Sequence, residues 1–239
     1  MWARQGIELS GRVKNLFSTA LIHACSGLAY LRQGKIDTAF KLLQEGYALS
    51  SDADIRALIS LAAGSLGHCY LLMERPEEAL PILKDAVDPQ ILKASIFPSI
   101  YPITVLAETY RLMGQTGKAR QNAGEALQIF RQTGERCFGA WALYEMAIIQ
   151  SENNSKQIEE APYTYQLAID LAEELNMKPL QAHCHLKFGQ HYAKIEKTDL
   201  ARSEFLNAID LYRSLGMAFW LPMAEARFSE IDEEASSKA

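Results

Sequence analysis

A pattern of small residues recurs about every 40 residues along this 239-residue chain. Each copy begins with a glycine or alanine that a tyrosine follows three positions later, although the fourth copy has Gln150 in place of the tyrosine. A period of this length is typical of repeat proteins, whose units pack on their neighbours instead of around one central core. The pattern therefore constrains the fold more than any other feature. The five starting residues are Gly27, Gly67, Ala107, Ala147 and Gly189.

Two further small residues complete each copy. An alanine comes twelve positions after the starting residue, or fourteen in the longer fourth copy, and another small residue follows seven positions later. Antiparallel helices that cross closely need small side chains at the crossing points, and the tyrosine fills the space beside them. The spacing thus predicts a series of helix hairpins without strands. The alanines are Ala39, Ala79, Ala119, Ala161 and Ala201, and the later small residues are Gly46, Ala86, Ala126, Ala168 and Ala208.

Two copies resemble the tetratricopeptide repeat. They read Leu66-Gly67-x-x-Tyr70 with Ala79, Leu83 and Ala86, and Phe188-Gly189-x-x-Tyr192 with Ala201, Phe205 and Ala208. The resemblance implies an all-α fold, a right-handed α-solenoid of about five antiparallel hairpins with a C-terminal capping helix. The family's usual unit has about 34 residues, whereas HEAT and armadillo units have about 40 to 47. Because the extra length falls between one hairpin and the next, we favour tetratricopeptide-like hairpins with lengthened helices, and HEAT is the alternative.

The repeat spacing also predicts the boundaries within a single solenoid. Counting back from Gly27 places residues 1–15 in the second helix of a truncated hairpin, where Trp2, Ile7 and Leu9 would lie exposed. We therefore expect a fragment of a longer protein that self-associates through this N-terminal helix, and a shortened natural cap is the alternative. The expected repeats are 16–50, 56–92, 98–133, 137–176 and 179–216, followed by a capping helix at 218–235.

Composition limits the classes of partner and compartment. The net charge of −5 gives no broad attraction for nucleic acid or anionic lipid, so neither is an expected partner. No stretch of about 18 apolar residues predicts a membrane span. The four cysteines form no CxxC pair, which favours reduced thiols and a cytoplasmic location.

The sequence offers no recognisable catalytic or cofactor motif. His183-Cys184-His185 is the one group of metal-ligating residue types, but neighbours two positions apart on a helix point to nearly opposite faces. Adjacent carboxylates such as Glu159-Glu160 are typical of solvated helix faces. P-loop, dinucleotide-binding and nucleophile-elbow patterns are missing. We therefore predict a non-catalytic protein that needs no cofactor.

The concave groove formed by the first helices of the hairpins is the predicted binding site. In each repeat it is lined by the residues six and three positions before the starting residue and by those one and four positions after it. Its middle is aromatic and polar, which suits a peptide or ligand. The alternative for Trp141 and Tyr144 is packing against neighbouring helices. Tetratricopeptide domains that bind the C-terminal carboxylates of chaperones carry Lys and Asn at groove positions where this chain has Ala24, Leu28, Gly64 and His68, so that role is not expected. The predicted groove residues are Tyr101, Thr104, Glu108, Arg111, Trp141, Tyr144, His68 and Gln190.

The last quarter of the chain, from Asn176-Met-Lys-Pro-Leu180 to Ala218-Phe-Trp220, carries a second resemblance. It is similar to the C-terminal end of bacterial signalling proteins that join a class III adenylate/guanylate cyclase, a P-loop ATPase and a tetratricopeptide array. This implies a protein-interaction or regulatory sensor module of such a protein. The alternative is the inducer-sensing domain of an ATP-dependent LuxR-type transcription activator, and an enzyme with unfamiliar motifs is the third hypothesis.

Overall fold

The chain folds into α-helices, as a computed structural model shows. The structure describes residues 5–8, 15–96, 100–152 and 156–238, and none of these residues lies in a strand. The described helices pair in chain order, so the prediction of an all-α fold made of helix hairpins is confirmed. The chain divides into two compact units, an N-terminal unit of residues 1–138 and a C-terminal unit of residues 139–239.

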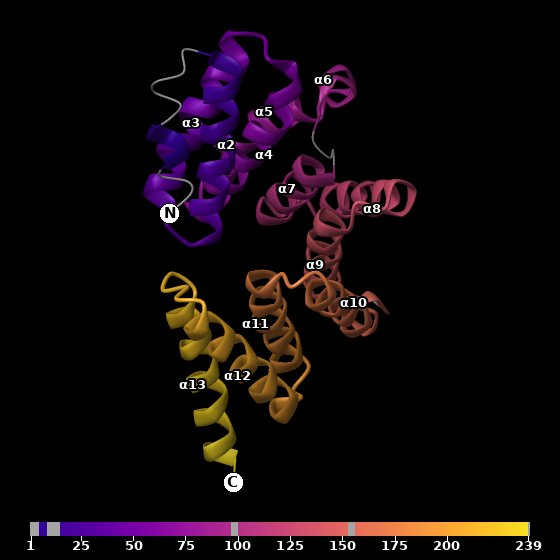
Figure 1. Cartoon of the computed structure of the whole chain (residues 1–239). Helices are drawn as coiled ribbons and strands as arrows, with labels where there is room; N and C mark the ends of the chain where they lie inside the picture. The colour runs from indigo at the N-terminus through magenta and orange to yellow at the C-terminus, as the bar shows by residue number, and fades with distance from the viewer. Residues whose placement is uncertain (1–4, 9–14, 97–99, 153–155, 239) are drawn as a thin grey trace. The chain divides into compact units, whose positions relative to one another are not determined.

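The N-terminal unit contains successive antiparallel pairs, α2 with α3, α4 with α5 and α7 with α8 (Figure 1). The first helices of these pairs also contact one another, because α4 packs against both α2 and α7. The first helices of three successive hairpins therefore lie next to one another. The helices are α2 (Leu16–Arg32), α3 (Ile36–Asp52), α4 (Arg56–Leu72), α5 (Pro76–Ala86), α6 (Pro89–Ala94), α7 (Ile100–Leu112) and α8 (Thr116–Thr133).

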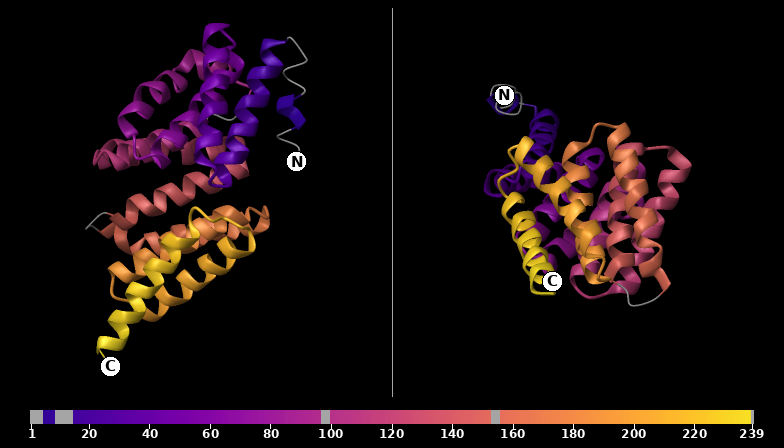
Figure 2. Two further views of the ribbon diagram at one scale, coloured as in Figure 1. Left: turned by 90° about the vertical axis from the view of Figure 1, so that its left-hand side faces the viewer. Right: turned by 90° about the horizontal axis from the view of Figure 1, so that it is seen from below.

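The C-terminal unit continues the same arrangement. Helix α11 packs against both α10 and α12, and α12 packs against α13 (Figure 2). Its core includes Tyr165, whose ring stacks on that of Phe188 with the ring centroids 5.0 Å apart. The elements are α9 (Arg136–Glu152), which begins in the N-terminal unit, η1 (Lys156–Glu159), α10 (Ala161–Glu174), α11 (Lys178–Lys194), α12 (Thr198–Ser214) and α13 (Leu221–Lys238).

The small residues of the repeat lie at helix crossings in both units. The five alanines at the second position of the pattern are all fully buried. At the first position, a Cβ atom added to Gly67 would lie 2.7 Å from Leu83, and one added to Gly189 would lie 2.7 Å from Phe205. These distances leave no room for a side chain, so glycine allows each first helix to approach its partner.

Short turns with one left-handed residue join most helices. The middle residue of the turn is a glycine at Gly34 and Gly114, with φ of 73° and 72°. The equivalent residues Glu74 and Glu196 have φ of 60° and 59° although they carry side chains, and Asn176, in the turn between α10 and α11, has φ of 52°. In each of these turns the next residue donates its N–H to a carbonyl five positions earlier, which closes the preceding helix. The repeat thus imposes one backbone conformation on different residue types.

Helix length accounts for most of the 40-residue period. Helices α2, α3, α4, α9, α11 and α12 each contain 17 residues. In the second repeat the paired helix α5 ends at Ala86 and a separate helix, α6, follows it. The side chain of Asp88 accepts a hydrogen bond from the N–H of Gln90, and Pro89 occupies the first turn of α6.

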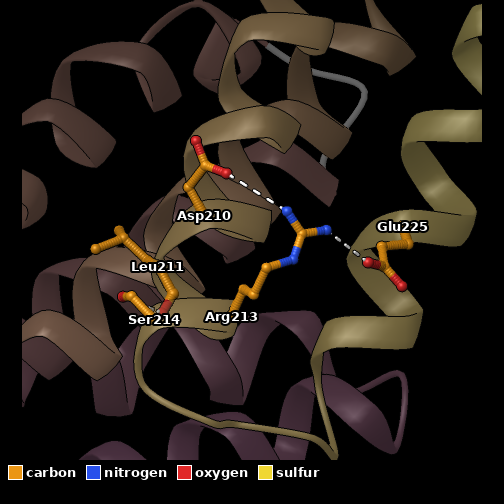
Figure 3. Close-up of polar contacts among 5 residues, drawn as sticks. All are labelled: Asp210, Leu211, Arg213, Ser214 and Glu225. Atoms are coloured by element: carbon orange, nitrogen blue, oxygen red, sulfur yellow. Dashed lines mark hydrogen bonds and ion pairs between the residues drawn. The ribbon is translucent and has the colours of Figure 1, made fainter.

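Helix α13 covers α12 in the C-terminal unit. Trp220, just before α13, and Ala224 and Ile231 along it are buried. Figure 3 shows the guanidinium of Arg213 on α12 between Asp210 of the same helix, at 3.9 Å, and Glu225 of α13, at 3.0 Å. Apolar burial and this surface ion pair together attach α13 to the preceding hairpin.

Part of the segment that we expect to form the N-terminal helix lies outside the described residues. Within 1–15 the structure describes a helical turn at 5–8 and Asn15, whose side chain accepts a hydrogen bond from the N–H of Ser18 and so caps α2. Ile7 is half-buried, whereas Trp2 and Leu9 are not among the described residues. Among the helices that are described, none combines the length and the hydropathy needed to cross a bilayer.

Candidate functional site

The stacked first helices of the N-terminal unit bring five polar or charged side chains together, which we name the polar cluster. A carboxylate oxygen of Glu108 lies 3.9 Å from Nε2 of His68, and its other oxygen lies 3.7 Å from a guanidinium nitrogen of Arg111. The guanidinium carbon of Arg32 lies 5.9 Å from the ring centroid of Tyr101. The cluster comprises Arg32 at the end of α2, His68 on α4, and Tyr101, Glu108 and Arg111 on α7.

Helix periodicity and one glycine explain why these residues meet. Tyr101, Glu108 and Arg111 are separated by seven and three positions, so they lie on one face of α7. A Cβ atom added to Gly64 would lie 3.2 Å from the Tyr101 ring. Glycine at this point of α4 therefore lets the aromatic ring pack close to the helix backbone.

The environment of the polar cluster is largely dry. Burial, and to a lesser extent the charge of Arg32, lowers the pKa of His68 to about 3, so its imidazole is neutral at pH 7. Burial raises the pKa of the Tyr101 hydroxyl, which is therefore protonated. The side chain of Arg111 is only 8% exposed, which means that its charge acts in a medium of low dielectric.

Two buried hydroxyl groups, one in the polar cluster and one beside it, have no hydrogen-bond partner. The Oη atom of Tyr101 and the Oγ atom of Ser65 are both buried, and Ser65 lies close enough to influence the pKa of Tyr101 without a hydrogen bond of normal geometry between them. A buried polar group without a partner costs about 1–3 kcal/mol. By contrast, the buried hydroxyl of Thr104 donates to the carbonyl of Ile100 at 2.7 Å, so it is satisfied within α7.

The C-terminal unit has an aromatic cluster on its corresponding helices. Trp141 and Tyr144 on α9 are half-buried and meet edge to face, with ring centroids 5.9 Å apart. The ring of His183 on α11 lies 5.9 Å from that of Trp141 and 4.9 Å from that of Trp220. Nδ1 of His183 lies 2.7 Å from the hydroxyl of Tyr212 on α12. This cluster presents aromatic faces around a buried imidazole.

Trp141 and Tyr144 also pack against the hydrophobic core of their unit, as the packing alternative describes. Each keeps part of its surface exposed, so packing does not account for the whole side chain. Gln190 is half-buried on α11, next to Gly189 at the crossing with α12. Of the predicted groove residues of this unit, Trp141 and Tyr144 are in contact with each other.

The three residues His183, Cys184 and His185 take separate partners. His183 faces the Tyr212 hydroxyl, whereas Nδ1 of His185 lies 2.6 Å from a carboxylate oxygen of Glu204. Cys184 is fully buried, and burial raises the pKa of its thiol. Across the described parts of the chain, no three His, Cys, Asp or Glu side chains gather closely enough to hold a metal ion.

Three members of these two clusters, Arg32, Tyr212 and Trp220, and the adjacent Ser65 lie outside the groove positions that the repeat predicts. Arg32 lies five positions after Gly27 and Ser65 lies two positions before Gly67, whereas the groove positions that we derived from the repeat are six and three before and one and four after. His183 does occupy a derived groove position. Tyr212 and Trp220 belong to a second helix and to the capping segment, so a search confined to first helices misses them.

Comparison with known proteins finds similarity in fold. No protein-family model matches the sequence, and no curated protein is similar to it. Among solved structures, aspartyl phosphate phosphatase F from Bacillus subtilis has a TM-score of 0.62 and 17% identity over 92% of this chain and 60% of its own. The tetratricopeptide-sensor protein of the class of signal transduction ATPases with numerous domains, from Pyrococcus horikoshii, has a TM-score of 0.61 and 19% identity over 95% of this chain and 34% of its own.

A chain of the Cut9–Hcn1 hetero-tetramer of APC/C is also similar, with a TM-score of 0.59 and 16% identity over 89% of this chain and 38% of its own. This chain thus spans less than two thirds of the length of each of these three proteins. At such identities the likeness concerns the fold, and it supports a tetratricopeptide-type α-solenoid in preference to HEAT repeats.

Proposed function

We propose that this chain is a protein-interaction module that binds a partner segment along the inner faces of its first helices and acts by binding alone. The observation that carries the proposal is the polar cluster on α2, α4 and α7. Charged groups beside buried hydroxyls without hydrogen-bond partners are costly for stability, so a binding role accounts for their presence better than folding does.

The proposal extends to the C-terminal unit through the aromatic cluster. Partly exposed tryptophan and tyrosine side chains are the residues most often found at the centre of interaction sites, because they bury much area at little entropic cost. Trp141 and Tyr144 fit this role, and Gln190 provides a further polar group on α11. Both units therefore contribute residues to the proposed interaction, each on its own helices.

Selection of binding peptides from a random display library tests this function. We expect 12-residue peptides whose affinity falls when Trp141 is changed to alanine or Arg111 to glutamine. The matched control is Gln128→Ala, on the outer helix α8, which should leave binding unchanged. Peptides that bind all variants equally, or a library that gives no binder, would count against the proposal.

The wider role that we propose is a regulatory sensor within a cytoplasmic bacterial signalling protein of the cyclase and ATPase type. The resemblance of residues 176–220 supports this, and so does the fold likeness to a signalling ATPase whose name includes a tetratricopeptide sensor. The alternative is small-ligand sensing in a LuxR-type activator. A thermal-shift screen in which a small molecule saturates and stabilises the chain, while no peptide competes, would favour that alternative.

Self-association is a separate proposal for the N-terminal edge. Leu16 and Phe17 at the start of α2 are 57% and 40% exposed. Exposed large apolar side chains tend to become covered, and a second copy of the chain would cover these. We expect sedimentation velocity to show a dimer that Phe17→Glu dissociates, and a monomeric mass at high concentration would contradict the proposal.

A further inference from the structure

A buried histidine without a hydrogen-bond partner lies among aromatic rings in the C-terminal unit. His191 on α11 is 2% exposed, and neither of its ring nitrogens has a partner. The ring centroids of Tyr165, Phe188 and Tyr192 lie 6.2, 6.2 and 5.7 Å from that of its imidazole. A buried polar ring that makes no hydrogen bond costs stability, so packing alone does not account for a histidine at this position.

The charges that act on His191 are positive. Burial lowers the pKa of the imidazole, and Lys194 and Lys197 lower it further. Lys194 lies one turn further along α11, and Lys197 lies in the turn between α11 and α12. Protonation of His191 in the folded unit would therefore add a third positive charge beside two others, where the surrounding rings provide no acceptor.

Acidic side chains of the neighbouring elements α9, η1, α10 and α12 do not offset these charges. A carboxylate oxygen of Glu204 on α12 lies 2.6 Å from Nδ1 of His185, and Glu160 at the start of α10 accepts from the side-chain amide of Gln150 at 3.3 Å. Within the described part of the unit, no carboxylate is among the groups that shift the pKa of His191. The acidic side chains at these places are Glu152, Glu159, Glu160 and Glu204.

Lys194 also ties α11 to the end of α9. Its ammonium nitrogen donates to the carbonyl of Ser151 at 2.8 Å and to that of Glu152 at 3.3 Å, in the last turn of α9, where carbonyls lack partners within the helix. The hydroxyl of Ser151 lies 3.3 Å from that of Tyr165 on α10. His191, one turn before Lys194 and next to the Tyr165 ring, therefore lies beside the contacts that join the ends of α9 and α10 to α11.

We propose that the end of α9 and the start of α10 form an acid-operated latch on α11, which protonation of His191 by a solvent proton releases. The imidazolium repels the ammonium of Lys194 and requires water around it, and both needs are met when the ends of α9 and α10 move away from α11. At neutral pH the imidazole is uncharged and the latch is closed. Since α9 also carries Trp141 and Tyr144, release loosens the helix that presents the partly exposed aromatic pair.

Native-state hydrogen exchange of the full chain at pH 7.5 and pH 5.5 tests the latch. A histidine exposed by opening has a pKa of about 6.5, so the population of the open form should rise about tenfold between these two pH values. We expect the protection factors of the amides at 149–152, corrected for intrinsic exchange, to fall about tenfold and to be insensitive to low concentrations of urea. Amides at the centre of α12 should keep higher protection that urea lowers. If both sets of amides have equal protection and equal urea dependence, only global unfolding occurs and the proposal is wrong.

Variants separate the titration from the tie. His191→Phe fills the space of the ring but does not titrate, so the tenfold fall between pH 7.5 and pH 5.5 should vanish. His191→Gln gives the same test if phenylalanine does not fit. His185→Gln, on the same helix, is the matched control and should keep the fall. A fall that persists without His191, or that His185→Gln removes equally, would overturn the proposal.

Lys194→Met tests the closed form of the latch. It removes the donor to the carbonyls of Ser151 and Glu152, so the amides at 149–152 should lose protection at both pH values while those at the centre of α12 change little. Unchanged protection at 149–152 would show that Lys194 does not hold the end of α9, and the latch would not exist.

Discussion

The two units of this protein share one packing pattern but expose different chemistry on their first helices. The N-terminal unit contains 15 Lys and Arg against 13 Asp and Glu, and its cluster is built from charged groups and hydroxyls. The C-terminal unit contains 9 Lys and Arg against 16 Asp and Glu, and its cluster is aromatic. Buried small residues are the same in both. The repeat therefore constrains the crossings between helices and leaves the inner faces free to differ.

The largest expected effect tests whether the two units use the same packing. Tyr110→Ala in the N-terminal unit and Phe205→Ala in the C-terminal unit each remove a buried ring, and each should cost about 3–5 kcal/mol of unfolding free energy through the cavity left behind. Denaturant unfolding measures the loss, and native-state hydrogen exchange shows which unit carries it. If one variant loses unfolding free energy and the other does not, the two units do not share the same packing.

Enlarging a crossing residue should have a somewhat smaller effect. Ala119 and Ala201 are fully buried at equivalent positions, so Ala119→Leu and Ala201→Leu should overpack the hairpin and cost about 1–3 kcal/mol each. Gly124→Ala on the same helix as Ala119 is the control, because an added Cβ there meets nothing within 4 Å. A neutral melting temperature for the leucine variants would contradict the proposed role of the small residues.

Acidification should destabilise both units. His68 has a lowered pKa of about 3, and burial followed by Lys194 and Lys197 lowers the pKa of His191. Below the unfolded pKa of about 6.5 the unfolded chain binds protons that the folded chain does not, so the unfolding free energy falls as the pH drops from there towards the folded pKa. One histidine contributes at most about 1.4 kcal/mol per pH unit.

Hydrogen exchange between pH 7 and pH 5 can assign this effect to each unit. His68→Gln should flatten the pH dependence in the N-terminal unit, and His191→Gln should flatten it in the C-terminal unit. A pH dependence that survives both substitutions would indicate that other groups titrate on unfolding.

The smallest expected effect concerns the surface ion pairs of α13. The Arg213 side chain is 62% exposed and that of Glu225 is 46% exposed, so solvent screens their interaction. Arg213→Gln should therefore cost less than about 1 kcal/mol, whereas Trp220→Ala, which removes a buried ring from the aromatic cluster, should cost several times more. Thermal unfolding of the two variants gives the comparison, and a larger loss for Arg213→Gln would reverse our view of what holds α13.

Particular residues show which parts of the site could be predicted. The sequence places Glu108 and Arg111 one turn apart on a single helix, and their proximity follows from helix geometry alone. The edge-to-face contact of Trp141 with Tyr144 follows in the same way. The position of Arg32 beside Tyr101 does not, because these residues are 69 positions apart and meet only through the stacking of α2, α4 and α7.

The amino-acid sequence by itself determined the helix hairpins, their small crossing residues and the all-α fold. These features depend on local spacing and on contacts between neighbours in the chain, and a 40-residue period records both. Tertiary structure alone decided that Ser65 and Tyr101 bury hydroxyls without partners beside Arg32, and that His183 lies among Trp141, Tyr212 and Trp220. Such contacts depend on the angle and offset at which successive hairpins stack, and no periodicity in the sequence encodes this angle and offset.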